Sequence, residues 1–369
     1  PAILGHSNEG LRRALREQLD QAYTNRDCLA AIEAAEKIQQ VVPCAELVRF
    51  AVSGVDAVFN AIRVARAYTG RPLYVKFKGQ YNGGMDFVLG GRTDRGDLQA
   101  RDGVDPDDFY SAMCYTEGRA PHALDDCLLA EYNDLEGLAA LFQQQGDQIA
   151  CVIMEPVTLN MTGCMPEPGF LEGLRELCTR YGVLMVFDET LTGFRLALGG
   201  AQEYFGVRAD LVTFGKIIGG GMPVGAYCGS RTLMEQVAPC GPVYQAGTLS
   251  GNPVAMAAGL AQLHYLKDHP EVYTQLSEKG AFLAEGLTRA AQKTGAAVQI
   301  NHVESLCAPF FTPTPVTTFV DAKGSDLQAY ARYFAGMLQK GIALAPAQFE
   351  AMFVSTAHTE EELTYTIQA

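Results

Sequence analysis

The residue types best suited to chemistry are a lysine and an aspartate that each follow an apolar stretch. Lys216 lies in the glycine-rich run 210–223, 28 positions after Asp188. Asp188 follows the apolar run 183–187, which is too short for a typical helix and therefore predicts a buried parallel strand. Ligands of open α/β sheets bind at the carboxyl ends of such strands. We therefore expect Lys216 and Asp188 to belong to one site.

This pair suits a Schiff-base site for pyridoxal 5′-phosphate. The Lys216 amine would hold the aldehyde, and the Asp188 carboxylate would keep the pyridine nitrogen protonated so that the ring accepts electrons. Each residue also has an ordinary interpretation, because lysines beside glycines are often solvated and strand-ending aspartates often cap helices or form salt bridges. The surrounding sequence decides between these interpretations.

Several turns add polar groups that could hold such a cofactor. The turn Ser53-Gly54-Val55-Asp56 lies between a predicted strand and a predicted helix, where an anion or an ordinary serine cap would fit. Tyr81, in a glycine-flanked turn, could stack on a planar ring or pack at a surface.

Two further strand ends and turns carry polar residues. Glu155 closes another apolar run, and the nearby Asn160 carboxamide could reach a ring oxygen. The turn 244–253 could present the Gly247 N–H and the Thr248 hydroxyl to an anion.

The glycines at 219–221 do not form a nucleotide-binding motif. Lys216 precedes them, whereas a Walker loop needs its lysine after the glycines and a dinucleotide fingerprint follows a strand directly. A dehydrogenase is therefore disfavoured.

Composition excludes several other classes of protein. The chain has 369 residues, of which 48% are hydrophobic, and a net charge of −14, which argues against binding to nucleic acid or to an anionic membrane. No apolar run reaches the roughly 18 residues of a membrane span, and residues 1–20 lack the apolar core of a signal peptide.

Ten cysteines without a Cys-x-x-Cys pair predict reduced thiols, a cytoplasmic location and no metal. We expect Cys151 and Cys178 to be small core residues.

Alternating strands and helices predict a doubly wound, mainly parallel α/β sheet. The predicted strands are 46–53, 73–77, 126–131, 148–155, 183–187, 297–303 and 315–320. The predicted helices lie within 9–40 and at 57–68, 134–145, 170–181, 255–267, 273–294 and 326–339. The glycine- and aspartate-rich stretch 84–125 is either a substrate-side loop or an inert insertion.

These elements predict two domains. Residues 22–262 would form the large cofactor-binding domain, and residues 263–369 a smaller α+β domain against which residues 1–21 pack. The start at Pro1 without a methionine indicates a chain that was processed, truncated or excised.

Taken together, these motifs resemble the class-III aminotransferases of pyridoxal-phosphate fold type I, and within them the glutamate-1-semialdehyde 2,1-aminomutases. The resemblance spans nearly the whole chain and is most specific in the block 187–253. The matching segments are 1–6, 155–160, 187–195, 215–225, 241–253, 348–350 and 357–359.

The resemblance implies a role for each matching residue. Lys216 would carry the Schiff base and move the proton, Asp188 would pair with the pyridinium nitrogen, and Glu350 would lie at the substrate mouth. Thr248 would reach the phosphate of a partner subunit, which implies a homodimer with shared active sites. The implied cofactor-binding residues are Ser53, Gly54, Val55, Tyr81, Asn82, Glu155, Asn160, Asp188, Lys216, Gly247 and Thr248.

Some residues depart from the aminomutase pattern. Val55 replaces a residue with a hydroxyl, Asn82 replaces a histidine, and residues 84–125 have no clear counterpart of the family's gating loop. For these reasons the motifs favour a transaminase, which moves an amino group from an amine donor to a carbonyl acceptor. The alternatives are the aminomutase, which transfers it within one molecule in tetrapyrrole synthesis, and an aminotransferase domain excised from an assembly line. A homologue that only binds a ligand and has no catalytic activity would not need Lys216 and Asp188, so this class is disfavoured.

Overall fold

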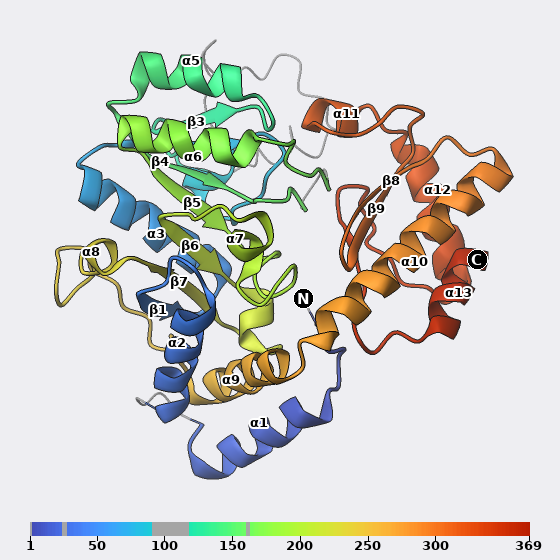
Figure 1. Cartoon of the computed structure of the whole chain (residues 1–369), viewed down its shortest axis with the longest axis horizontal. Coiled ribbons are helices and arrows are strands. Elements are labelled where there is room, and N and C mark those ends of the chain that lie inside the picture. The colour runs from blue at the N-terminus through green and yellow to red at the C-terminus, as the bar shows by residue number, and fades with distance from the viewer. Residues whose placement is uncertain (1, 24–27, 91–117, 160–162) are drawn as a thin grey trace.

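The computed structural model describes residues 2–23, 28–90, 118–159 and 163–369. Figure 1 shows a large part on the left, built around a seven-stranded sheet, and a smaller part on the right, built around a three-stranded sheet. Helix α10 extends from the large part across the small one.

The large sheet is mainly parallel, as the alternation of elements predicts. Its order is β1-β7-β6-β5-β4-β2-β3, and among these strands β7 runs antiparallel to both of its neighbours. Strands β4 and β5 are buried along their whole length, which explains their continuous apolar sequences. The strands are β1 (Leu47–Ala51), β2 (Leu73–Phe77), β3 (Cys127–Ala130), β4 (Ile149–Met154), β5 (Leu184–Asp188), β6 (Leu211–Phe214) and β7 (Gly225–Gly229).

Helices cover both faces of this sheet, which confirms the doubly wound fold. Along β5, Met185 and Phe187 join the apolar core that contains α2, α5, α6 and α9, whereas Leu184 and Val186 join the core that contains α3. The helices are α1 (Glu9–Gln21), α2 (Leu29–Val41), α3 (Gly54–Thr69), α5 (Leu135–Gln145), α6 (Phe170–Tyr181), α7 (Gly200–Phe205), α8 (Arg231–Met234), α9 (Pro253–Asp268), α10 (Glu271–Thr294), α11 (Phe319–Lys323), α12 (Leu327–Gln339) and α13 (Glu360–Gln368).

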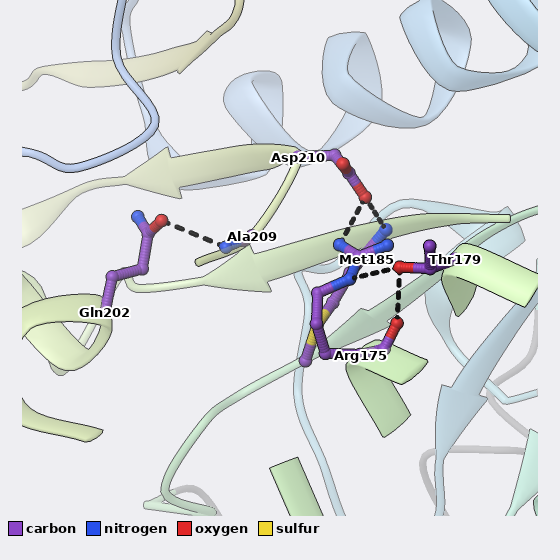
Figure 2. Close-up of polar contacts among 6 residues, drawn as sticks. All are labelled: Arg175, Thr179, Met185, Gln202, Ala209 and Asp210. Carbon is purple, nitrogen blue, oxygen red and sulfur yellow. Dashed lines mark hydrogen bonds and ion pairs between the residues drawn. The ribbon is translucent and has the colours of Figure 1, made fainter. Parts of the chain in front are cut away.

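Polar contacts fix β5 and β6 at the end of the sheet where these strands begin (Figure 2). One oxygen of Asp210 accepts from Arg175 Nη1 over 2.6 Å and from the Met185 N–H over 2.7 Å. The Gln202 carboxamide accepts from the Ala209 N–H over 3.0 Å. These contacts tie α6 and α7 to the strands whose opposite ends carry Asp188 and lead to Lys216.

The small part contains an antiparallel sheet of order β10-β9-β8, packed against α10. Its strands are β8 (Gln299–Val303), β9 (Leu306–Phe310) and β10 (Met352–Phe353). The predicted strand 315–320 is wrong, because Thr318 caps α11 through a reciprocal capping box with Asp321. The partner of β8 is β9, which follows after a two-residue turn at Glu304 and Ser305.

The N-terminal segment contacts both parts of the molecule. Helix α1 packs against α9, and Leu11 joins the apolar core of the large sheet. The Ile3 carbonyl accepts from the Thr356 N–H of the C-terminal segment over 3.0 Å. The predicted domain boundary at 262/263 falls inside α9. The two-domain division therefore stays a prediction.

Two predictions concern the cysteines and the membrane-spanning potential of the described residues. Cys151 and Cys178 are buried, as predicted, and burial raises the pKa of each thiol to about 12. The nine cysteines in the described ranges are all free. Within those ranges, no helix is long and apolar enough to cross a membrane.

Candidate active site

A cavity of about 310 Å³ opens where the strands β1, β2, β4, β5 and β6 end and their following turns begin. This is the edge of the sheet where ligands of α/β folds bind. The cavity brings together eight of the predicted cofactor residues. They are Ser53, Gly54, Val55, Tyr81, Asn82, Glu155, Asp188 and Lys216.

Asp188 is buried and held by hydrogen bonds on both carboxylate oxygens. Its Oδ1 accepts from the Thr190 N–H over 3.1 Å, from Thr190 Oγ1 over 2.6 Å and from Thr213 Oγ1 over 3.2 Å. Its Oδ2 accepts from Asn82 Nδ2 over 2.9 Å. Asp188 is therefore neither a helix cap nor a salt-bridge partner within the described residues, and its carboxylate lines the cavity instead.

Asn82 carries an unsatisfied acceptor beside Asp188. Its side chain is 2% exposed, and its Oδ1 has no hydrogen-bond partner among the described residues. Rotating the amide would place Oδ1 against the Asp188 carboxylate, so the orientation is fixed by charge. A buried acceptor without a donor is costly. A bound group with an N–H or O–H would satisfy it.

The turn at the start of α3 has the form of an anion site. Ser53 caps the helix by accepting from the Asp56 N–H over 3.3 Å, and its hydroxyl also donates to Asp56 Oδ2 over 3.1 Å. The first N–H groups of a helix have no partner within it, so those of Gly54 and Val55 suit an anion. A Cβ on Gly54 would lie 2.8 Å from Thr190 Oγ1. Ser53 is thus occupied as a cap, and the backbone N–H groups remain available to an anion.

Lys216 follows β6 in a strained turn. Its φ of 50° lies in the left-handed region that non-glycine residues rarely adopt, and such strain is concentrated at functional sites. The preceding Gly215 allows close packing, because a Cβ there would lie 3.2 Å from the Gly54 Cα. The lysine side chain is exposed to the cavity rather than packed in the core.

Glu350 and Tyr81 lie close enough to Lys216 and Asp188 to interact with them electrostatically. Burial raises the pKa of the Glu350 carboxyl, and the positive charge of Lys216 offsets part of this rise. The pKa of the Tyr81 phenol is raised by burial first, and then by the charges of Asp188 and Glu350. Tyr81 therefore stays neutral. Glu350, predicted at the substrate mouth, does not line the cavity, and its electrostatic interactions with Lys216 and Tyr81 connect it to this site.

Glu155 joins two of the turns around the cavity. Its Oε1 accepts from the Tyr81 N–H over 2.8 Å and its Oε2 from the Leu159 N–H over 3.1 Å. The Gln80 side chain exchanges two further hydrogen bonds with the Glu155 backbone, of 2.8 and 3.0 Å. Glu155 thus positions Tyr81 through its backbone.

The remaining predicted residues lie elsewhere. Gly247 and Thr248 are exposed and do not line the cavity. Their loop is anchored by Gln245, whose Oε1 accepts from Arg49 Nε over 2.7 Å and from the Tyr227 hydroxyl over 3.0 Å. Asn160 and residues 91–117 of the predicted substrate-side loop lie outside the described residues.

The sequence interpretation missed the two threonines that bind Asp188. Thr213 could have been noticed as the one polar residue in the apolar strand β6. Thr190 had a weaker signal, its position two residues after Asp188. The other missed cavity residues are Val52, Val58, Gly83, Leu191, Met222, Pro223 and Val224.

The residue after Asp188 provides a test of the electrostatics of this region. Glu189 is fully buried, and burial raises its pKa to about 7, against hydrogen bonds from Ala201 and Thr192 that lower it. The folded state therefore binds a proton more tightly than the unfolded state, so its stability falls as pH rises from about 4.5 to about 7. This loss of folding stability is on the order of 3 kcal/mol for one carboxyl with such a shift. We expect Glu189→Gln to abolish it.

Urea unfolding of wild type and Glu189→Gln at pH 5, 6, 7 and 8 measures this difference. The matched control is Glu136→Gln, which replaces an exposed acid on α5. If wild type and Glu189→Gln lose stability in parallel, Glu189 is not the group that titrates.

Comparison with known proteins gives consistent matches over the whole chain. The family model described as aminotransferase class-III matches residues 1–365. Glutamate-1-semialdehyde 2,1-aminomutase 2 of Lachnoclostridium phytofermentans is 49% identical over 368 residues, which cover 100% of this chain and 84% of that protein. The glutamate-1-semialdehyde 2,1-aminomutase of Ruminiclostridium cellulolyticum is 49% identical over 370 residues. The match covers 100% of this chain and 82% of that protein.

Solved structures match equally well in shape. An omega-transaminase from Sphaerobacter thermophilus superposes with a TM-score of 0.87 at 32% identity, over 100% of this chain and 83% of that one. A glutamate-1-semialdehyde aminomutase from Pseudomonas aeruginosa has a TM-score of 0.84 over 100% and 80% of the two chains. Its identity of 22% supports the fold alone.

Proposed function

Because the chain belongs to the class-III aminotransferase family, whose enzymes use pyridoxal 5′-phosphate, we propose that it acts as a glutamate-1-semialdehyde 2,1-aminomutase. In this reaction an amino group moves between neighbouring carbons of a single substrate. The observation that carries the proposal is 49% identity to aminomutases over the full length of the chain, combined with a cavity that holds both Lys216 and Asp188.

This proposal reverses the preference that the local motifs suggested. The departures at Val55 and Asn82 favoured a transaminase, but identity spread over 368 residues outweighs two positions. The transaminase remains the second candidate, since an omega-transaminase is 32% identical and superposes over the whole chain.

The residues around the cavity suit this cofactor. When bound, pyridoxal 5′-phosphate supplies an aldehyde for the amine and a ring that withdraws electrons from the amine-bearing carbon. The N–H groups of Gly54 and Val55 would hold its phosphate, and Asp188 Oδ2 would accept the ring N–H. Tyr81 would cover the ring. Val55 has no hydroxyl, so the backbone and the helix dipole carry more of the phosphate binding than a hydroxyl-bearing residue would require.

Lys216 Nζ performs the proton transfers. As a free amine, Nζ would take a proton from the amine-bearing carbon and deliver it to a neighbouring position. Glu350 lies near Lys216, so its carboxylate attracts a positively charged amine toward the cavity. Asn160 is proposed near the phenolic oxygen of the ring on the basis of the family resemblance alone.

The exposed loop that carries Thr248 supports a homodimer with shared active sites. Thr248 lies outside the cavity of its own chain, and the neighbouring Tyr244 and Leu249 are 69% and 60% exposed. Arg63 Nη1 on α3 donates to the Tyr244 carbonyl over 2.7 Å, which fixes the start of this loop. We place these residues against the phosphate turn of a partner subunit.

Replacing Thr248 by valine tests this arrangement. We expect the dissociation constant of pyridoxal 5′-phosphate to rise about tenfold, because a hydrogen bond to a charged group contributes about 1.5–3 kcal/mol. Thr248→Ser is the matched control and should bind as wild type does. Equilibrium dialysis measures the constant, and light scattering measures the mass. A monomer, or unchanged affinity in Thr248→Val, would rule out the shared site.

A visible absorbance titration separates the two candidate functions. Protein charged with pyridoxal 5′-phosphate is titrated with a panel of amino acids and simple amines. We expect ordinary donors to leave the absorbance of the bound cofactor unchanged, because an aminomutase needs no external donor. Bleaching by a common donor, with release of its keto acid, would instead support the transaminase.

A further inference from the structure

The two oxygens of Asp188 have unequal hydrogen bonding. Three donors reach Oδ1, and two of them belong to Thr190, whose hydroxyl makes the shortest contact at 2.6 Å. Oδ2 receives one donor, from Asn82. A carboxylate oxygen offers about two lone-pair sites. Oδ1 is therefore saturated, and Oδ2 keeps one site for a further donor.

Thr190 is held rigidly between two functional turns. A Cβ on Gly54, in the phosphate turn, would lie 2.8 Å from Thr190 Oγ1. A Cβ on Gly215, which precedes Lys216, would lie 3.0 Å from Thr190 Cγ2. Because neither glycine has a side chain, both turns pack closely against Thr190. Thr190 itself lines the cavity. The position of its hydroxyl therefore depends on the backbone of both turns.

We propose that Thr190 is a positioning residue, whose hydroxyl gives Asp188 Oδ1 its shortest hydrogen bond and leaves Oδ2 as the oxygen that would accept the N–H of the cofactor ring. With Oδ1 held in this way, the carboxylate has one favourable orientation. Without the hydroxyl, Oδ1 keeps only the Thr190 N–H and the longer contact of 3.2 Å with Thr213, so the carboxylate is held less firmly and can rotate away from the ring nitrogen. This inference rests on the proposed pairing of Asp188 with the cofactor.

The hydroxyl and the shape of Thr190 can be separated by substitution. Thr190→Val keeps the branched shape but loses the donor, and Thr190→Ser keeps the donor but loses the methyl group. The matched control is Thr192→Val, because Thr192 is also a buried threonine, but its hydroxyl bonds to Glu189 over 3.3 Å instead of to Asp188.

Cofactor affinity and the cofactor's spectrum provide readouts that do not depend on turnover. We expect Thr190→Val to raise the dissociation constant of pyridoxal 5′-phosphate about tenfold, the scale of one hydrogen bond to a charged group. In a pH titration of the bound cofactor's absorbance, Thr190→Val should also shift the pH at which half of the change has occurred. Thr190→Ser and Thr192→Val should stay within about twofold of wild type. Thermal unfolding of the protein without cofactor checks that each variant folds.

Two results would overturn the proposal. Wild-type affinity and midpoint in Thr190→Val would show that the hydroxyl is dispensable, and equal damage in Thr190→Ser would assign the effect to shape. If Thr190→Val does not fold, Thr190→Cys replaces it, since a thiol is a weak donor of similar size to serine.

Asp188→Asn, measured in parallel, distinguishes failure of this inference from failure of the proposed function. Normal affinity in Thr190→Val with impaired Asp188→Asn would overturn the role of Thr190 alone. Normal behaviour of Asp188→Asn would overturn the pairing of Asp188 with the ring, and the inference with it.

Discussion

Replacement of Lys216 by alanine is expected to abolish turnover, with a loss of at least about four orders of magnitude. Lys216 is the proposed nucleophile toward the aldehyde and the group that moves the proton, and no other lysine is among the described residues that line the cavity. Its side chain lies in the cavity and not in the core, so the free energy of unfolding should change by less than about 0.5 kcal/mol. Steady-state rates and urea unfolding measure the two quantities.

Lys216→Arg is the matched control for charge. Arginine keeps a positive charge near Glu350 but stays protonated, so it can neither add to the aldehyde nor accept a proton. We expect it to be as inactive as Lys216→Ala. Measurable turnover in either variant would contradict the assignment of Lys216.

The second large effect is expected from Asp188→Asn. An amide cannot hold the ring nitrogen protonated, so kcat should fall by about two to three orders of magnitude, as when a single preorganised electrostatic contact is removed. The substitution also turns one oxygen into a donor. With Oδ1 bound to Thr190, the new NH2 group would face Asn82 Nδ2, which is itself a donor. We expect a loss of about 1–3 kcal/mol in stability.

A double variant separates these two consequences. In Asp188→Asn combined with Asn82→Asp, the amide and carboxylate exchange places, and the hydrogen bond between them forms in the opposite direction. Stability should recover in part while kcat stays low, because the carboxylate no longer lies at position 188. Near-normal kinetics in Asp188→Asn alone would move the electrostatic role to another residue.

Much of the site could be predicted from the sequence because it is built from strand ends. Each buried strand has a continuous apolar sequence, and parallel strands end at one edge of the sheet. A polar residue that ends such a strand, as Asp188 does, or directly follows it, as Glu155 does, therefore falls in the cavity. The alternation along β5, with Met185 on one face and Val186 on the other, follows from the same geometry.

Contacts between distant segments could not be predicted in this way. The run 315–320 has residues typical of a strand, but the hydrogen bonds of Thr318 begin a helix there. The amphipathic helix α1 has an apolar side but no local signal of its partner, which proved to be α9. The contact between Thr190 and Asp188 depends on how the turn after β5 folds back, and on the space left by Gly54.

The choice between transaminase and aminomutase shows a further limit of local motifs. Val55 and Asn82 line the cavity, and their departure from the family pattern favoured a transaminase over the aminomutase. In the structure the Ser53 hydroxyl serves as a helix cap, and Asn82 donates a hydrogen bond to Asp188. Neither contact distinguishes transfer within one molecule from transfer between two.

Conversion of glutamate-1-semialdehyde without any other substrate tests the central proposal most directly. The semialdehyde, labelled with ¹³C at the amine-bearing carbon, is added to protein loaded with pyridoxamine 5′-phosphate, and NMR follows the label. We expect the labelled carbon to become a carbonyl carbon in a product of unchanged mass. No conversion until an external amine or keto acid is added would contradict the aminomutase and identify a transaminase.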